Sequence, residues 1–222
     1  MVETNGRNFD LLTLGQVLLR LSPPDNERLS RGDTFVKQVG GAELNVAVGA
    51  ALLGLHTGVI SKLPAHDIGS FMKGKIRSFG VSDDFFMYDQ SPAARVGIYY
   101  YENGAYPRKP KVIYDRNHSS FFSLDIDEIP EEVYTASKCF HTTGITLALN
   151  EDIRETTIEM IKRFKAAGTL VSFDVNFRGN LWTGDQAREC ILRILPYVDI
   201  FFCSEDTARL TFLKTGTARE MM

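Results

Sequence analysis

Apolar positions along the chain change repeatedly between a spacing of about two residues and a spacing of about 3.6 residues. The first spacing is typical of strands and the second of amphipathic helices, so their alternation predicts an α/β fold. The length allows one large domain or two small ones, and no internal repeat, low-complexity tract or linker is visible. Short apolar segments predict buried strands at residues 9–15, 57–61, 138–142, 169–174 and 198–203.

Helices are predicted between these strands. The clearest begins near residue 150, places Ile153, Thr157 and Ile161 on one face, and ends at Gly168, a residue suited to a left-handed C-terminal position. Further helices are predicted at about 67–79, at 184–194 and at 205–214.

Two segments interrupt this alternation. Residues 17–39 are rich in turn-forming residues, and residues 94–116 are rich in Tyr and Val on both sides of a Gly/Pro turn, which predicts a hairpin. Strands without intervening helices favour a small antiparallel sheet attached to the main one. We expect this sheet to act as a lid over a site.

The composition is that of an ordinary globular domain, with 222 residues, 44% of them hydrophobic and 24% charged. Twenty-five Lys and Arg oppose 28 Asp and Glu, so the net charge of −3 argues against binding to nucleic acid. The longest apolar stretches are far shorter than the roughly 20 residues that cross a bilayer. The N-terminus shows no secretory pattern, and we expect a cytoplasmic protein with no membrane partner.

Cysteine and histidine do not occur at metal-ligand spacings, so no metal site is predicted from them. The cysteines are expected to be small, reduced, buried residues. The residues concerned are Cys139, Cys190, Cys203, His56, His66, His118 and His141.

The first candidate site is the pair Gly40 and Gly41, followed by a helix of small residues that carries Asn45 in its first turn. Glycines let the backbone approach a ligand closely, and a helix N-terminus offers free N–H groups. Asn45 would add a side-chain amide that both donates and accepts. The alternative is a tight loop followed by close helix packing.

The second candidate site is the predicted hairpin. A period of two places Tyr99 and Tyr101 on one face and Tyr100 on the other, and Tyr114 shares a face with Arg116. A Tyr/Arg face can stack on a polar ligand, and Arg can bind a carboxylate through two parallel hydrogen bonds. The alternative is a Tyr-rich subunit interface.

The third candidate site follows the strand predicted at 169–174, where Asp174, Asn176 and Arg178 alternate with apolar residues. Ligands bind at the C-terminal ends of strands in open α/β sheets. The alternative is structural, with Asp174 capping the loop and pairing with Arg178.

These three segments, in this order, resemble the PfkB or ribokinase-like carbohydrate kinases. The segments GGAELNVA, GIYYYENG, VIYDRNHSSF and SFDVNFRGNLW resemble the 2-keto-3-deoxygluconate kinase branch in particular. The resemblance implies a three-layer αβα sandwich with a small β-sheet lid, of which residues 1–222 form the N-terminal part. It also implies ATP and Mg²⁺ as cofactors. We further expect a homodimer formed through the lid, because a small two- or three-stranded sheet is rarely stable without something covering its outer face.

The resemblance assigns roles by position. Gly40, Gly41 and Asn45 would hold sugar hydroxyls, and a second group of residues would bind the sugar acid from the lid. Arg178, with Asn176 beside it, would lie between the sugar and the transferred phosphate, and Ser204 would lie near the nucleotide. The lid group comprises Tyr99, Tyr114 and Arg116.

Three departures from the family pattern stand out. Gln16 occupies a position where many relatives have an acid, and Thr207 occupies the position of the Glu in the family's Asn-x-x-Glu motif. The family's Gly-Ala-Gly-Asp segment, which supplies the catalytic base, is absent from the 222 residues. We therefore expect the chain to be the front part of a longer kinase and to be nearly inactive alone.

The function expected from the resemblance is ATP-dependent phosphorylation of a sugar acid, 2-keto-3-deoxygluconate, to its 6-phosphate. One alternative is another PfkB-type kinase such as a fructokinase, whose neutral substrate would leave Arg116 without a carboxylate partner. The other is a non-catalytic module that binds a sugar acid or forms a dimer.

Overall fold

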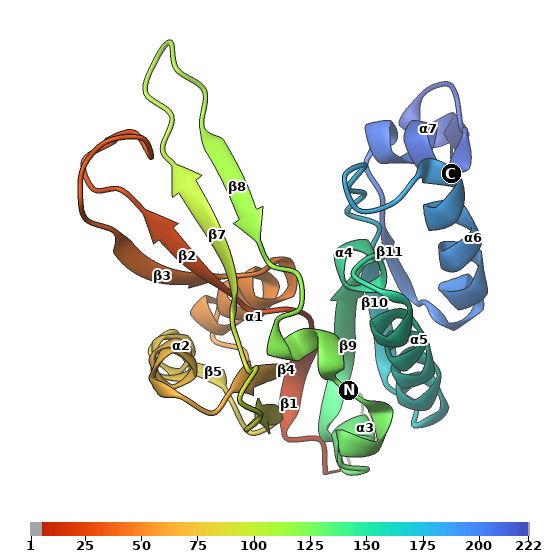
Figure 1. Ribbon diagram of the computed structural model, residues 1–222. Helices are drawn as coiled ribbons and strands as arrows, with labels where there is room; N and C mark the ends of the chain where they lie inside the picture. The colour runs from red at the N-terminus through yellow and green to blue at the C-terminus, as the bar shows by residue number, and fades with distance from the viewer. Residues whose placement is uncertain (1–5, 222) are drawn as a thin grey trace.

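The computed structural model describes residues 6–221 (Figure 1). A seven-stranded sheet forms its centre, and β1 lies between β9 and β4 with all neighbouring strands parallel. β5 and β6 both pair with β4. Its strands are β1 (Phe9–Leu14), β4 (Thr57–Pro64), β5 (Val81–Ser82), β6 (Phe86–Asp89), β9 (Ser137–Thr143), β10 (Leu170–Asp174) and β11 (Ile200–Phe202).

Helices pack on both faces of this sheet. Two consecutive residues of β4 point to opposite faces of the sheet. Val59 packs with α1 and α2, whereas Ile60 packs with α5. The main helices are α1 (Ala42–Leu52), α2 (Asp67–Arg77), α5 (Glu151–Ala166), α6 (Gly184–Ile194) and α7 (Glu205–Phe212). The shorter ones are η1 (Ser120–Ser123), η2 (Ile126–Glu128), α3 (Val133–Ala136), α4 (Gly144–Leu147), η3 (Leu195–Tyr197) and α8 (Ala218–Met221).

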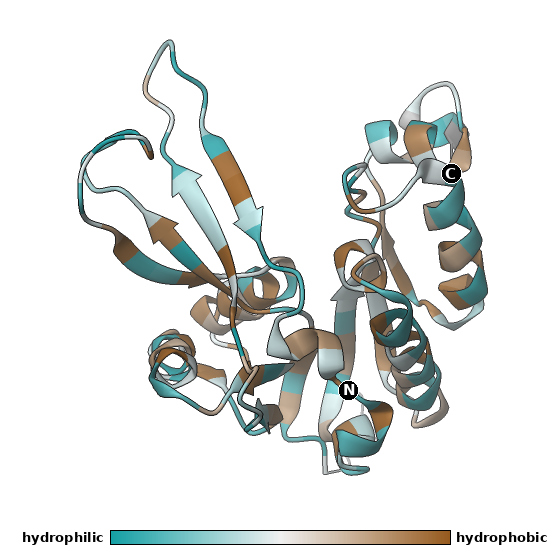
Figure 2. Cartoon of the chain, viewed as in Figure 1, coloured by the Kyte–Doolittle hydropathy of each residue, from teal (hydrophilic) through white to brown (hydrophobic). Residues whose placement is uncertain are grey.

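Local signals explain where α5 begins and ends. The Asn150 side chain accepts a hydrogen bond of 2.8 Å from the backbone N–H of Ile153, which caps the helix. Gly168 has a φ of +73°, a conformation that glycine adopts without strain, and it ends the helix as predicted. The apolar side of α5 faces the sheet and its polar side faces outward (Figure 2).

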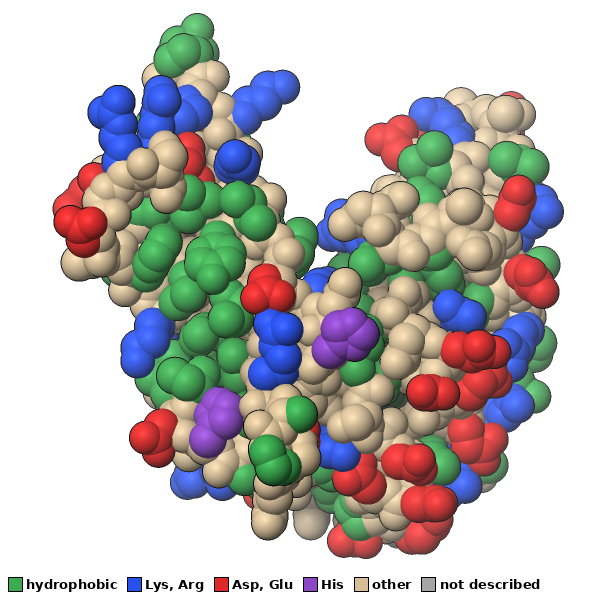
Figure 3. All heavy atoms as spheres, viewed as in Figure 1, with side chains coloured by type: hydrophobic (Ala, Val, Ile, Leu, Met, Phe, Trp, Pro, Cys, Tyr) green, Lys and Arg blue, Asp and Glu red, His purple; other side chains and the backbone are tan. Residues whose placement is uncertain are grey.

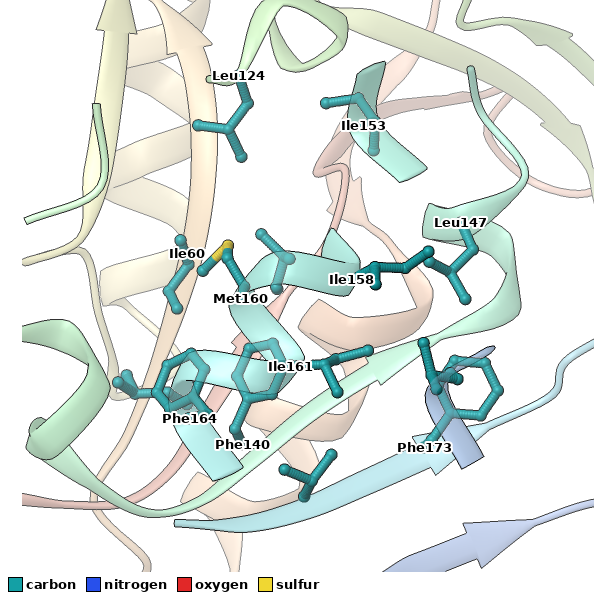
Figure 4. Close-up of a cluster of buried hydrophobic side chains, with 14 of the residues drawn as sticks. Ile60, Leu124, Phe140, Leu147, Ile153, Ile158, Met160, Ile161, Phe164 and Phe173 are labelled. Carbon is teal, nitrogen blue, oxygen red and sulfur yellow. The ribbon is translucent and has the colours of Figure 1, made fainter. Parts of the chain in front are cut away.

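The core beneath α5 is aromatic and aliphatic (Figure 4). The ring of Phe140 on β9 stacks on Phe164 of α5 with centroids 4.1 Å apart, and both side chains are fully buried. Truncation of such a side chain to Ala costs about 3–5 kcal/mol, so this contact fixes α5 on the sheet.

The lid is a separate four-stranded sheet with the order β3, β2, β7, β8. β7 and β8 form the predicted antiparallel hairpin, but β2 and β7 are parallel, so the expectation of an antiparallel sheet is wrong for this pair. The chain between them passes through the main sheet and its helices, a crossover long enough to bring β7 back in the same direction. The strands are β2 (Leu18–Ser22), β3 (Val36–Gly40), β7 (Gly97–Glu102) and β8 (Lys111–Asp115).

The last strand also differs from the prediction of a buried strand at 198–203. In β11, Ile200, Phe201 and Phe202 are 42%, 39% and 55% exposed. β11 pairs only with β10, so it is an edge strand of the sheet that the structure describes. The apolar composition thus identified the strand, whereas the expectation that it is buried is wrong for the described residues. Within residues 6–221, no helix is both long and apolar enough to cross a membrane.

Candidate functional site

A cleft of about 500 Å³ separates the lid from the C-terminal end of the main sheet. Figure 3 shows the molecule hollowed between the lid and the part formed by α4, α6 and α7. The cleft walls come from the β1–β2 loop, the start of α1, the inner face of the lid, α4 and the loop after β10. This is the place where open α/β sheets bind ligands.

Six of the residues assigned a binding role in the sequence line this cleft together: Gly41, Asn45, Tyr99, Tyr114, Arg116 and Arg178. Gly40, Asn176 and Ser204 are outside its lining. Gly40 lies directly behind Tyr99, because a Cβ atom at Gly40 would be 2.4 Å from the Tyr99 hydroxyl. Gly40 therefore makes room for a residue of the cleft.

The other two residues outside the lining stabilise loops. The backbone N–H of Asn176, whose φ is +37°, donates to Oδ1 of Asp174 at 3.0 Å. The Ser204 hydroxyl caps α7 by accepting from the backbone N–H of Thr207 at 3.2 Å. No ion pair joins Asp174 and Arg178 in the described structure, so the predicted alternative of a structural pair is not found.

The floor of the cleft is built from the N-terminus of α1. Gly41 precedes the helix with a φ of +152°, and a Cβ atom there would lie 2.7 Å from the backbone oxygen of Gln16. Only glycine fits this approach. The first turn of α1, with Asn45, therefore faces the cleft with its N–H groups and the positive end of its dipole.

The inner face of the lid is aromatic and cationic. Strand register places Arg20 beside Tyr99 and Tyr99 beside Tyr114. The rings of Tyr99 and Tyr114 lie 6.0 Å apart, and the guanidinium of Arg20 lies 4.4 Å from the ring of Tyr101. Burial raises the pKa of Tyr99, which keeps its hydroxyl protonated as a hydrogen-bond donor.

Arg116 lines the cleft at the end of β8, where the chain leaves the lid. Its Nε donates a hydrogen bond of 2.7 Å to Oε1 of Gln16, and its guanidinium lies 5.7 Å from the ring of Tyr114. Burial lowers the pKa of Arg116, while the negative charge of Glu43 opposes that shift. No ion pair within the described residues includes Arg20, Arg116 or Arg178, so their charges are available to an anionic ligand.

Sequence reasoning missed Glu43. Its side chain is 2% exposed, and its Oε1 accepts hydrogen bonds from Thr143 at 2.6 Å and from Thr146 at 2.7 Å. Burial raises the pKa of Glu43, although these hydrogen bonds and the charge of Arg116 act in the opposite direction. An acid in the first turn of a helix is commonly an exposed partner of the helix dipole, so the sequence carried no signal for its burial.

Metal-binding chemistry has little support in this cleft. Within residues 6–221, no group of three or more His, Cys, Asp or Glu side chains is placed to hold a metal ion. His141 is buried beside Ser172, with 2.9 Å between Nδ1 and Oγ, and burial lowers its pKa to about 4. The cleft instead combines cations, phenols and an amide, which suit a small polyhydroxy anion.

Comparison with known proteins agrees with this chemistry. Residues 8–221 match the pfkB family carbohydrate kinases. The chain is 36% identical over 209 residues to a 2-dehydro-3-deoxygalactonokinase from Haloferax volcanii, an alignment that covers 94% of this chain and 65% of that protein.

Solved structures give the same result for the fold. The crystal structure of a 2-dehydro-3-deoxygluconokinase from Thermotoga maritima superposes with a TM-score of 0.88 at 33% identity, over 93% of this chain and 63% of that one. An uncharacterized sugar kinase from Pyrococcus horikoshii in complex with ATP superposes with a TM-score of 0.77 at 25% identity, over 91% and 66%. The predicted ribokinase-like α/β fold is confirmed. The chain spans 63% to 66% of the length of these three proteins.

Proposed function

The chain belongs to the pfkB family of carbohydrate kinases, and from this premise we propose that the protein phosphorylates a 2-keto-3-deoxy sugar acid, 2-keto-3-deoxygluconate, with ATP as the phosphoryl donor. The observation that carries the proposal is Arg116, a partly buried guanidinium without a carboxylate partner among the described residues. A buried charge without a partner is costly, and a substrate carboxylate would supply one. A neutral sugar would not.

Substrate orientation follows from the cleft walls. Arg116 would bind the carboxylate, while the hydroxyls of Tyr99 and Tyr114, the amide of Asn45 and the backbone at Gly41 would bind the sugar hydroxyls. This arrangement directs the far end of the substrate, with its primary hydroxyl, toward Arg178 and the loop after β10.

The proposed reaction is a phosphoryl transfer. The oxygen of the primary hydroxyl forms a bond to the γ-phosphorus of ATP, the bond between that phosphorus and the bridging oxygen breaks, and ADP leaves. The hydroxyl proton must pass to a base. Since catalysis of this kind depends on positioning and charge stabilisation, the residues of the cleft would hold the acceptor hydroxyl in line and Arg178 would stabilise the transferring charge.

The described residues fit the two expected cofactors unequally. Arg178 lies at the cleft with no carboxylate partner in residues 6–221, which suits the phosphates of ATP, the group that supplies the transferred phosphoryl when bound. The acids nearest Ser204 do not form a Mg²⁺ site, because Glu205 and Asp206 both pair with Arg209.

The base is the remaining requirement. Asp174 is half-buried and its Oδ1 already accepts the backbone N–H of Asn176. We propose that the base comes from a Gly-Ala-Gly-Asp segment, which the 222 residues do not contain. The 222-residue chain alone would then bind substrate without turning it over.

Binding measurements test the proposal and separate it from its rivals. Calorimetric titration with 2-keto-3-deoxygluconate, with its 4-epimer and with fructose should favour an acid over fructose. Arg116→Ala should weaken acid binding by about 2–5 kcal/mol, the loss expected for a buried charge-assisted pair, and leave fructose nearly unchanged. Preference for fructose would support the fructokinase alternative. Absence of binding to any sugar would support the alternative of a non-catalytic module that only forms a dimer.

We also propose that the protein forms a homodimer through the outer face of the lid. Register places Leu21, Tyr100 and Ile113 in one row on the face opposite the cleft. Phe35 contacts Tyr100 with ring centroids 5.9 Å apart, and Phe35 and Ile113 are 45% and 44% exposed. A small sheet with one apolar face uncovered gains stability when a second copy covers it.

A further inference from the structure

Gln16 lies between the end of β1 and the start of β2, and its side chain is only 3% exposed. The chain that leaves the lid after β8 runs directly against it. We propose that Gln16 is a positioning residue that fixes the guanidinium of Arg116 for an anionic group of the substrate. This inference rests on the proposed function, because it presupposes that Arg116 binds the substrate carboxylate.

Three hydrogen bonds define the role of the amide. Nε of Arg116 donates to Oε1 of Gln16 at 2.7 Å, and Nε2 of Gln16 donates to the backbone oxygen of Arg116 at 3.1 Å and to Oγ of Ser119 at 2.6 Å. A guanidinium can only donate and a carbonyl can only accept, so these partners permit one orientation of the amide. Gln16 therefore holds both the side chain and the backbone of Arg116.

The hydrogen bond to Gln16 determines which nitrogens of the Arg116 guanidinium can contact a ligand. Its Nε is occupied by Gln16, while the two Nη groups remain for a ligand carboxylate in the cleft. Because the amide is neutral, Gln16 orients the guanidinium without compensating its charge. Gln16 restricts the rotamers of Arg116 before the ligand binds. Binding then costs less side-chain entropy, and this favours affinity.

Two glycines show that the space for Gln16 is closely defined. A Cβ atom at Gly97 would lie 2.9 Å from Nε2 of Gln16 and 3.4 Å from Cα of Arg116. A Cβ atom at Gly41 would lie 2.7 Å from the backbone oxygen of Gln16. Side chain and backbone of Gln16 are thus both enclosed, as a positioning role requires.

The competing role is direct contact between Gln16 and a sugar hydroxyl, since Gln16 also lines the cleft. The two roles predict different losses of ligand affinity when Gln16 is replaced. A direct contact would be lost equally for a sugar acid and for its neutral ester, whereas a positioning role acts only on the ligand that uses Arg116.

The test is calorimetric titration of the full chain with 2-keto-3-deoxygluconate and with its methyl ester. Gln16→Met keeps the length of the side chain but removes all three hydrogen bonds, and we expect acid affinity to fall about tenfold or more and ester affinity to change less than about twofold. Gln16→Glu keeps an acceptor for Nε of Arg116 but compensates the charge of the guanidinium, so acid affinity should fall below that of the parent while ester affinity changes less than about threefold. Ser119→Ala, which leaves the bond to the guanidinium intact, is the matched control and should stay within about twofold.

Arg116→Ala separates this inference from the proposed function. If Arg116→Ala selectively weakens the acid but Gln16→Met weakens acid and ester equally, or neither, the positioning role is overturned and the proposed function stands. If Arg116→Ala weakens acid and ester equally, the carboxylate role of Arg116 fails and both proposals fall. Thermal unfolding of each variant identifies a loss of fold, and Gln16→Asn, whose amide is one methylene shorter and retracts from Nε of Arg116, decides the question where Gln16→Met is unfolded.

Discussion

The hydroxyl of Thr143 donates a 2.6 Å hydrogen bond to the carboxyl group of Glu43, although the two residues are 100 positions apart in the chain. The contact joins the first turn of α1 to the end of β9 beneath the cleft. A Cβ atom at Gly15 would lie 2.2 Å from Oε2 of Glu43, so the end of β1 also closes around this carboxyl group. Three segments thus meet at one buried acid.

This arrangement predicts opposite outcomes for two substitutions at Glu43. Glu43→Ala leaves a cavity and two threonine hydroxyls without their acceptor, and we expect a loss of about 3 kcal/mol in the free energy of unfolding. Glu43→Gln keeps an acceptor oxygen and removes a charge that burial disfavours, so it should cost much less at neutral pH. Urea unfolding measures both, and equal losses would show that the charge itself is required.

The raised pKa of Glu43 also predicts how the stability of the protein depends on pH. Burial raises the folded-state pKa of Glu43, so the folded protein binds this proton more tightly than the unfolded chain does. The contribution of Glu43 to stability therefore falls as pH rises from the ordinary glutamate range through the raised value. The measurement is the difference in free energy of unfolding between the parent and Glu43→Gln from acidic to neutral pH. This difference should decrease as the pH rises. An increase with pH would contradict it.

For His141 we expect the opposite effect of pH, with stability that rises as the pH rises. Burial lowers its pKa to about 4, below the roughly 6.5 of an unfolded histidine, so the unfolded chain binds more protons between these values. Stability should drop by about 2 kcal/mol between about pH 7 and pH 5, and His141→Gln should remove most of that drop. His118→Gln is the control, because His118 is exposed. An unchanged pH dependence in His141→Gln would refute the assignment.

The sequence predicted regular elements well where the cause is local. Helices α5 and α6 begin at capping residues that the sequence displays, and Gly168 ends α5 as expected. The period of two also predicted the division of lid residues, since Tyr99 and Tyr101 line the cleft while Tyr100 lies on the other face.

Features that depend on distant contacts were not predictable in this way. The burial of Glu43 comes from Thr143 and Thr146, and the orientation of Arg116 comes from Gln16, each about 100 positions away. Gln16 drew notice only as a departure from a family pattern. The parallel pairing of β2 with β7 likewise depends on the path of the intervening chain and on no local signal.

Arg20 and Tyr101 extend the cationic surface of the lid beyond Arg116. The guanidinium lies 4.4 Å from the ring centroid, and a cation–π contact of this kind contributes about 0.5–2 kcal/mol. We expect Arg20→Ala and Tyr101→Leu each to weaken binding of the sugar acid several-fold. Lys37→Ala is the matched control, because Lys37 makes a similar contact with Phe71 outside the cleft lining. A loss no larger than that of the control would exclude Arg20 from the site.

The proposed dimer makes a prediction about the outer face of the lid. Ile113→Asp places a charge in the exposed apolar row that includes Tyr100, and desolvating that charge at an interface is unfavourable. Sedimentation equilibrium should show a dimer for the parent and a monomer for Ile113→Asp. Leu53→Asp is the control, since Leu53 is 85% exposed at the C-terminal cap of α1 and is not part of the lid. A parent that is monomeric well above micromolar concentration would make the lid a cover only.

The last prediction concerns substrate binding and turnover by the 222-residue chain itself. The residues that we propose to bind the substrate, Asn45, Tyr99 and Arg116 among them, line one cavity, whereas the sequence contains no Gly-Ala-Gly-Asp segment. Phosphoryl transfer loses most of its rate when both the base and the backbone cradle for the transferring charge are missing. We therefore expect calorimetry to detect the sugar acid while a coupled ADP-release assay detects no ATP-dependent turnover. The control is the same chain with Arg116→Ala, which should lose the binding signal. Turnover by the 222-residue chain within about tenfold of ordinary kinase rates would show that the catalytic groups lie among these residues, with Asp174 then the first acid to test by Asp174→Asn.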